Sequence, residues 1–310
     1  MRAMVTGASG FVGRRLVDAL RRDGAEVLAC GGPHDREPEF FPIDLADAAS
    51  LSAALTAARP QIVFHLAAQA FVPESIRSPL ATFEINALGT ARLAEAVRAC
   101  GADPTPRILF TSSAEVYGAR EAGEYPLRES LDPRPANPYG ASKAAAEAIL
   151  LAEAQSYGLD VVIARAFNQI GPGQSEPFVV ASMAAQLARI AGGAQPQMYV
   201  GNLASGRDFL DVRDVVEAYL ALARRGEGAH IYNVCSGRAV TIRDILRELI
   251  AIARVPVEVR EDPQRMRKVD VPLTVGSPER LRTATGWQPR FSLVATLRDI
   301  YQAALQKEEA

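Results

Sequence analysis

Short apolar runs alternate with helical patterns through the first 166 residues of this 310-residue chain. The sequence predicts strands and helices in turn at 3–6, 11–22, 26–30, 48–58, 62–66, 79–100, 107–111, 137–157 and 160–166. Regular alternation of this kind indicates a parallel sheet with helical crossovers on both faces. We therefore expect an α/β fold with a Rossmann-type doubly wound sheet, whose ligands bind at the carboxyl ends of the strands.

The pattern loosens after residue 166, and 310 residues are more than one core usually holds. The Gly and Pro content of 168–177 predicts a loop. Further helices are expected at 179–190, 241–253 and 293–306, with a strand at 257–260. We interpret 1–166 as a dinucleotide-binding domain to which 206–235 return. The remaining segments, 167–205 and 236–310, are expected to form a smaller α/β substrate domain.

Composition excludes several classes of protein. The formal net charge is −2 without a basic stripe, which argues against nucleic acid as a partner. Charged residues and prolines interrupt the apolar stretches before the roughly 20 residues of a membrane span, and the chain enters a strand pattern too early for a signal peptide. The three cysteines are far apart, which predicts neither disulfides nor a metal site. We expect a cytoplasmic protein.

A glycine-rich turn, "TGASGFVG" at 6–13, follows the first strand and opens the first helix. Gly7, Gly10 and Gly13 permit a tight turn and a close approach of the backbone to a pyrophosphate. Helix amides that follow the turn would face this anion. The turn therefore predicts dinucleotide binding, with Phe11 and Val12 as part of the cradle.

The end of the second strand bears on the type of dinucleotide. In "ACGGPHDRE", glycines occupy the position where an acid often binds the adenosine ribose. Loss of that charge favours NADP, with Arg36 or Arg14 pairing with the 2′-phosphate. Asp35 lies close enough in sequence to move in, so NAD stays possible. The candidates for adenine contact, at the end of the third strand, are Asp44 and Leu45.

A Tyr-Lys pair begins the helix predicted at 137–157. Asn137 is a good N-cap, so Tyr139 and Lys143 would share one face of the first turns. An ammonium beside a phenol favours the tyrosinate and lowers the phenol pKa, which suits a proton donor. Lys143, one of only three lysines in the chain, could also bond the nicotinamide ribose. Ser113 ends a strand and could bond the reacting carbonyl oxygen.

These motifs, together with "HLAA" at 65–68 and "SSAEVYG" at 112–118, resemble the extended short-chain dehydrogenase/reductases that act on nucleotide sugars. The resemblance covers nearly the whole chain. It implies Ser113, Tyr139 and Lys143 as the catalytic triad and His65 as a structural residue. It also places beside the cofactor Leu66, Ala67 and Ala68.

The resemblance extends to the substrate side. "ARAFNQIGPGQ" at 164–174 looks like the segment in which Asn168 contacts the sugar nucleotide, and Val179 follows it. "GRDFLDVRD" and "RKVDVP" look like the segments that supply two diphosphate ligands, Arg207 and Arg267. Guanidinium groups suit this task because their fork matches phosphate oxygens.

Within the family, the chain is most similar to reductases that convert GDP-4-keto-6-deoxy-D-mannose to GDP-D-rhamnose. Hydride transfer from NADPH to the C4 ketone is the implied reaction. Glu115 keeps a 4,6-dehydratase open, because it stands where such enzymes carry a base. A C4 epimerase uses the same triad, and a non-catalytic dinucleotide sensor would not need it. Relatives pair through four-helix bundles, which implies a homodimer built from the helices 79–100 and 137–157.

Overall fold

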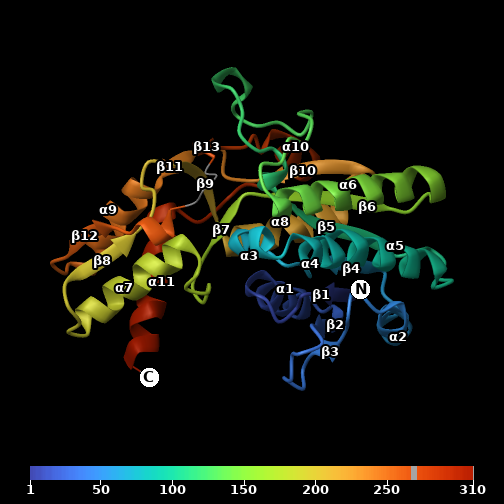
Figure 1. Cartoon of the computed structure of the whole chain (residues 1–310). Helices are drawn as coiled ribbons and strands as arrows, with labels where there is room; N and C mark the ends of the chain where they lie inside the picture. Colours follow the sequence, from blue (N-terminus) through green and yellow to red (C-terminus); the bar gives the residue numbers. More distant parts are fainter. Residues whose placement is uncertain (267–270, 310) are drawn as a thin grey trace.

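The computed structural model describes residues 1–266 and 271–309, in which a large sheet stands beside a smaller body of short strands and helices (Figure 1). The large sheet has seven parallel strands in the order β10-β6-β5-β4-β1-β2-β3. Its order reverses between β1 and β4, which creates the switch point of a doubly wound sheet. The predicted fold class is confirmed. The strands are β1 (Arg2–Thr6), β2 (Glu26–Gly31), β3 (Phe41–Pro42), β4 (Ile62–His65), β5 (Arg107–Ser113), β6 (Val161–Ala166) and β10 (His230–Val234).

Helices cover both faces of this sheet. Alternate strand residues point to opposite faces, so Met4 packs in one core cluster and Val5 in the other. The Val5 side is covered by α1 (Phe11–Arg22), α8 (Val212–Arg225) and α10 (Glu279–Thr285); the Met4 side by α2 (Ala48–Ala58), α5 (Gly89–Ala99) and α6 (Pro138–Tyr157). No helix in the described ranges is long and apolar enough to cross a membrane.

The helix predicted at 79–100 is interrupted by a wider turn. It consists of α4 (Pro79–Phe83), a π-helical turn η1 (Glu84–Leu88) and α5, and it follows the short α3 (Val72–Arg77). Turns of this kind are rare and occur often at functional sites. Here the turn carries Asn86, which is buried and faces α6.

The smaller body has its own apolar core. In its four-stranded sheet β9 (Gly206–Asp211) pairs with β7 (Asn168–Ile170), β11 (Ala239–Thr241) and β13 (Leu273–Thr274). A second sheet pairs β8 (Gln197–Val200) with β12 (Glu258–Glu261). Three helices pack on these strands: α7 (Val179–Ala191), α9 (Ile242–Ala253) and α11 (Leu293–Glu309). The 3₁₀ turns are η2 (Ala114–Val116), η3 (Ala122–Glu124) and η4 (Pro263–Arg265).

Two expectations are corrected by this sheet. The prediction of a loop throughout 168–177 was wrong, because β7 pairs in parallel with β9. The segment 206–235 does not return to the large sheet as a unit: β9 stays in the smaller sheet, and only α8 and β10 join the larger one. β7 and β9 are about 40 residues apart in the sequence, so local composition could not reveal that they pair.

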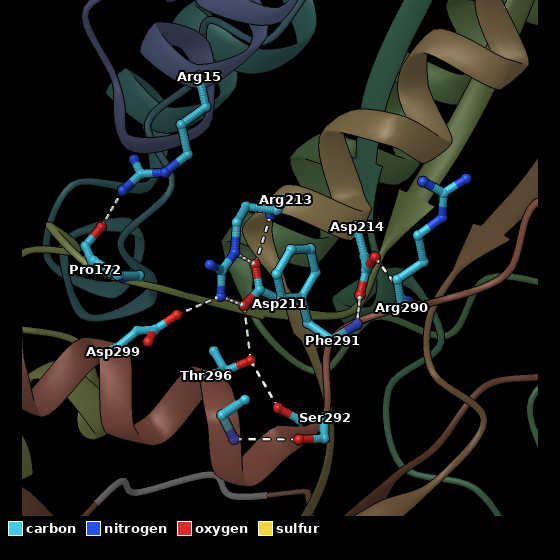
Figure 2. A network of polar contacts seen from close by, with 11 residues as sticks. Arg15, Pro172, Asp211, Arg213, Asp214, Arg290, Phe291, Ser292, Thr296 and Asp299 are labelled. Carbon is cyan, nitrogen blue, oxygen red and sulfur yellow. Dashed lines mark hydrogen bonds and ion pairs between the residues drawn. The ribbon is translucent and has the colours of Figure 1, made fainter.

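A polar network ties the two bodies together at the start of α8 (Figure 2). Asp211 caps α8 by accepting the Arg213 amide at 2.8 Å, and its carboxylate also binds the Arg213 guanidinium and the Thr296 hydroxyl at 2.7 Å each. Arg213 reaches Asp299 of α11 at 2.8 Å and lies over the ring of Phe291. The network therefore fixes α11 against the helix that follows β9.

Two further contacts flank this network (Figure 2). Asp214 of α8 accepts the backbone amides of Arg290 and Phe291 at 2.9 and 3.0 Å. Arg15 of α1 donates to the carbonyl of Pro172. The helix after the glycine-rich turn is thus joined to the loop that follows β7.

We expect Asp211→Ala to destabilise the protein by about 2–4 kcal/mol, because it removes a helix cap and leaves partly buried donors unpaired. Asp47→Ala is the matched control: Asp47 caps α2 at 2.9 Å but is exposed, and its loss should cost about 1 kcal/mol. Urea unfolding of both variants measures the difference. Equal losses would contradict a stabilising role for the network.

Candidate functional site

A cavity of about 1640 Å³ runs from the carboxyl ends of the large sheet into the smaller body. Most predicted site residues line it: Gly7, Gly10, Phe11, Val12, Gly13, Asp44, Leu45, Leu66, Ala67, Ala68, Ser113, Glu115, Tyr139, Lys143, Asn168, Val179 and Arg207. Arg267 lies outside the described residues. Arg36 is exposed and does not line the cavity, so the structure does not bring it to the site.

The glycine-rich turn forms one end of the cavity. Gly7 has φ +69°, and a Cβ there would come within 2.8 Å of the Ala67 amide nitrogen. A Cβ on Gly13 would lie 2.1 Å from the Gly7 carbonyl oxygen. Gly10 precedes α1 without a side chain that caps the helix. The turn thus leaves a cradle beside a helix N-terminus, which suits a pyrophosphate.

The cavity contains an acid beside the carboxyl end of β2. The Asp35 carboxylate lines the cavity and accepts hydrogen bonds from the Ser9 hydroxyl at 2.6 Å and the Gly32 amide at 2.7 Å. The expected pairing of Arg14 with a 2′-phosphate meets competition, because Arg14 already binds Glu37 at 2.6 Å. Asp35 therefore occupies the region that the two glycines were expected to leave without charge.

The three residues predicted as a triad, Ser113, Tyr139 and Lys143, line one cavity. Asn137 caps α6 by accepting the Gly140 amide at 2.9 Å, as predicted, and Pro138 begins the helix. This start places Tyr139 in the first turn, opposite Ser113 at the end of β5. Lys143 lies one turn further on, and its Nζ donates to the Thr111 carbonyl at 2.7 Å.

The electrostatics of the triad differ from the expectation. Burial raises the pKa of Tyr139 to about 12, although its hydrogen bond with Ser113 lowers this pKa. Burial also lowers the pKa of Lys143, which is 2% exposed, to about 7. The prediction that Lys143 lowers the pKa of Tyr139 was wrong. The Lys143 ammonium points at a backbone carbonyl, and loss of solvent dominates both groups.

His65 is held between two threonine hydroxyls. Its Nδ1 lies 2.8 Å from the Thr6 Oγ1, and its Nε2 lies 3.0 Å from the Thr90 Oγ1. Burial, with a smaller contribution from Lys143, lowers its pKa to about 3. His65 is therefore neutral near pH 7 and joins β4 to its neighbours, in agreement with a structural role.

Asn86 is a residue that the sequence reasoning missed. Its amide nitrogen donates to the Gln69 carbonyl at 3.0 Å and to the Ser142 hydroxyl at 2.9 Å, and its oxygen accepts the Gln69 amide. It thereby ties the loop after β4 to the helix of the Tyr-Lys pair. The signal in the sequence was an asparagine inside an otherwise helical pattern, where it has poor propensity.

Glu115 lies next to the triad, as expected. Its carboxylate accepts a hydrogen bond from the Asn137 side chain at 2.7 Å, and its charge acts to raise the pKa of Tyr139. The residue that caps α6 therefore also orients Glu115. A carboxylate at this place can serve as a base or as an electrostatic partner of the phenol.

The far end of the cavity belongs to the smaller body. Asn168 comes from β7 and Arg207, which is 9% exposed, from β9. Two lining residues were not anticipated. Arg265 of η4 donates to the Ser182 hydroxyl at 3.2 Å, and the backbone of Tyr199 is held by the Gln186 side chain. Cationic and aromatic groups at this end suit an anionic nucleotide.

The chain is similar to proteins of known activity. The family model described as GDP-mannose 4,6 dehydratase matches residues 4–300. GDP-6-deoxy-D-mannose reductase of Pseudomonas aeruginosa is 42% identical over 96% of this chain and 95% of its own length.

Solved structures agree with this relationship. RMD from Pseudomonas aeruginosa, complexed with NADPH, superposes with a TM-score of 0.89 at 39% identity over 99% of this chain and 100% of its own. UDP-glucose 4-epimerase of Thermus thermophilus, complexed with NAD, has a TM-score of 0.88 at 34% identity over 98% and 99%. Since both the family model and the 42% identity extend over nearly the whole length, the chain belongs to the GDP-mannose 4,6 dehydratase family.

Proposed function

We propose that the protein reduces the C4 ketone of a nucleotide-linked 4-keto-6-deoxy sugar, converting GDP-4-keto-6-deoxy-D-mannose to GDP-D-rhamnose. The observation that carries the proposal is the pair of Ser113 and Tyr139 in one cavity between a dinucleotide cradle and a buried arginine, Arg207. The 42% identity to a GDP-6-deoxy-D-mannose reductase supports the sugar and the base.

Each group of the triad has a distinct role in this reaction. When bound, the reduced nicotinamide supplies the hydride. Ser113 donates a hydrogen bond to the C4 oxygen, and Tyr139 gives that oxygen its proton, which completes the alcohol. A raised pKa keeps Tyr139 protonated near pH 7 before the reaction. The Lys143 ammonium stabilises the tyrosinate that remains.

Substrate binding falls to the smaller body. Arg207 and, by its sequence motif, Arg267 bind the diphosphate, while Asn168 and Val179 contact the sugar nucleotide. Arg207 is suited to this task because a largely buried guanidinium binds phosphate with little competition from water.

We propose NADPH as the reductant, with NADH also accepted. The RMD structure with NADPH supports the first part, and the position of Asp35 supports the second. A carboxylate there can accept a hydrogen bond from the ribose 2′-hydroxyl of NADH, whereas it repels a 2′-phosphate. The residues of the glycine-rich turn serve both cofactors alike.

A 4,6-dehydratase remains the second candidate because Glu115 lies beside the triad. That reaction would begin with GDP-mannose and end without net cofactor use. The hydrogen bond from Asn137 occupies one Glu115 oxygen and leaves the other for such a base.

We expect GDP-4-keto-6-deoxy-D-mannose to cause NADPH oxidation, seen as loss of absorbance, and GDP-mannose to cause none. Conversion of GDP-mannose to a 4-keto sugar would instead establish the dehydratase. A UDP-hexose epimerised without added cofactor would establish an epimerase. Cofactor binding without any turnover would indicate a sensor.

We expect Tyr139→Phe to lower kcat by about 10²–10⁴ with little change in cofactor affinity, because only the proton donor is lost.

We expect Asp35→Ala to raise the preference for NADPH over NADH by about tenfold, since a unit charge near the 2′-phosphate is worth about 1 kcal/mol or more. The ratio of kcat/KM for the two cofactors measures this change. Arg36→Ala is the control and should leave the ratio unchanged, because Arg36 does not line the cavity. A marked loss of NADPH preference in Arg36→Ala would support the predicted pairing of Arg36 with the 2′-phosphate.

We propose a homodimer in which the helices 79–99 and 138–157 of two subunits form a four-helix bundle. Leu80 is 85% exposed and Leu88 47% exposed on the first of these segments, which suits a covered face. Light scattering should give a dimer for the wild type and a monomer for Leu80→Asp. The control is Val259→Asp, at an exposed valine of β12, which should remain dimeric. A monomeric wild type would refute the proposal.

A further inference from the structure

A buried ion pair lies behind the triad, outside the cavity. Glu147 of α6 and Arg165 of β6 are each 2% exposed. The Arg165 Nε lies 3.0 Å from Glu147 Oε1 and its Nη2 lies 2.7 Å from Oε2, so the pair is bidentate. The Ser112 hydroxyl donates to the same carboxylate at 2.5 Å. Buried charges are costly to dehydrate, so this pair invites an explanation beyond packing.

The position of the Glu147–Arg165 ion pair links it to Lys143. Glu147 follows Lys143 by four residues on α6, which places the two side chains on one face of the helix. Ser112, which binds Glu147, immediately precedes Ser113 of the triad. The bidentate contact prevents the carboxylate from swinging away. The carboxylate of the ion pair thus stays on the face of α6 that also carries Lys143.

Lys143 needs a nearby anion because its other surroundings offer little compensation. Its Nζ donates to the neutral Thr111 carbonyl and lies 4.7 Å from the centre of the Phe110 ring, both on β5. From β4 it faces His65, which is neutral. Burial lowers the pKa of Lys143 to about 7, and the charge of Glu147 opposes that effect.

Two other ionisable groups of the described residues lie on α6 and on the neighbouring strand β6. Tyr139 lies one turn earlier on the same helix and is protonated near pH 7. Arg165 lies on the neighbouring strand β6, with Glu147 bound to its guanidinium and the Tyr117 ring 4.7 Å from it. Its positive charge counteracts part of the effect of Glu147, but Glu147 shares the helix face of Lys143.

We propose that Glu147 is a positioning residue for the reaction: its carboxylate, locked by Arg165 and Ser112, favours the protonated form of the buried Lys143 side chain. The proposal rests on the proposed function only for the use that catalysis makes of this charge. Protonation of Lys143 itself can be measured without any substrate.

The sequence offers a direct measurement, because the chain has only three lysines, Lys143, Lys268 and Lys307. With ¹³C at the lysine Cε, an NMR spectrum of the purified protein holds three side-chain signals, which Lys268→Arg and Lys307→Arg assign. We expect Lys143 to titrate with a pKa of about 7, far below an ordinary lysine at about 10.4. Glu147→Gln should lower the midpoint of the Lys143 titration by about one pH unit. An unchanged midpoint would overturn the proposal.

Two variants separate the charge from packing. Glu153→Gln makes the same change on the same helix, where Glu153 pairs with Arg98 at 3.4 Å, and should leave the midpoint as it is. Glu147→Asp retains the carboxylate and should restore most of the wild-type midpoint. A midpoint as low in Glu147→Asp as in Glu147→Gln would argue for a packing effect and against the proposal.

A double variant tests the proposal even if Glu147→Gln does not fold. If Glu147→Gln does not fold because it leaves Arg165 unpaired, Glu147→Gln/Arg165→Gln removes both charges. The Lys143 midpoint should still fall below that of the wild type, since the charge on its own helix face is lost. A wild-type midpoint in the double variant would overturn the proposal.

Kinetics then test the catalytic part. The charge on Lys143 is present below its pKa and is lost as pH rises through it, so kcat should decline over that range. Glu147→Gln should shift this decline to lower pH, by the displacement seen in NMR, with KM for the sugar nucleotide nearly unchanged because Glu147 does not line the cavity. A shifted NMR midpoint with an unshifted kcat profile would refute the positioning role. Absence of turnover in the wild type would refute the proposed function instead, and NMR would still decide the state of Lys143.

Discussion

Dehydration of the Lys143 ammonium is the constraint on which the rest of the site depends. A buried lysine tends to lose its proton, and here burial brings its pKa to about 7. The groups that surround it each offset part of that cost: a backbone carbonyl, the face of Phe110 and the carboxylate of Glu147. A site in which this charge were lost would hold a phenol without the cation that stabilises its conjugate base.

The polar contacts below the cavity form one connected set. His65 lies between two threonines, and Thr90 donates to the Asn86 carbonyl at 2.6 Å. Asn86 then reaches Ser142, whose hydroxyl donates to the Tyr139 carbonyl at 2.8 Å. The end of β4 is thus joined to α6 through side chains without net charge. Such a path fixes the backbone at Tyr139 while adding no charge that would compete with Lys143.

Local sequence signals predicted a large part of this arrangement, and the reason is physical. The N-cap at Asn137 and the four-residue spacing of Tyr139 and Lys143 act within one helix turn, so they can be read without knowledge of the fold. The glycine-rich turn is local as well. The π-helical turn at Asn86 and the pairing of β7 with β9 depend on packing between distant segments, and they escaped prediction.

The sequence alone therefore determined the fold class, through the alternation of strands and helices, and two local parts of the site, the turn at Gly7 and the Tyr-Lys pair on one helix face. Only the tertiary structure decided how these groups titrate and what surrounds them. It brought Asp35 rather than Arg36 to the cavity and placed Glu147 with Arg165 behind Ser113 and Lys143. It also raised the pKa of Tyr139 where the spacing alone suggested a lowered one. Burial and long-range contacts govern these properties, and neither is encoded in the spacing of residues along the chain.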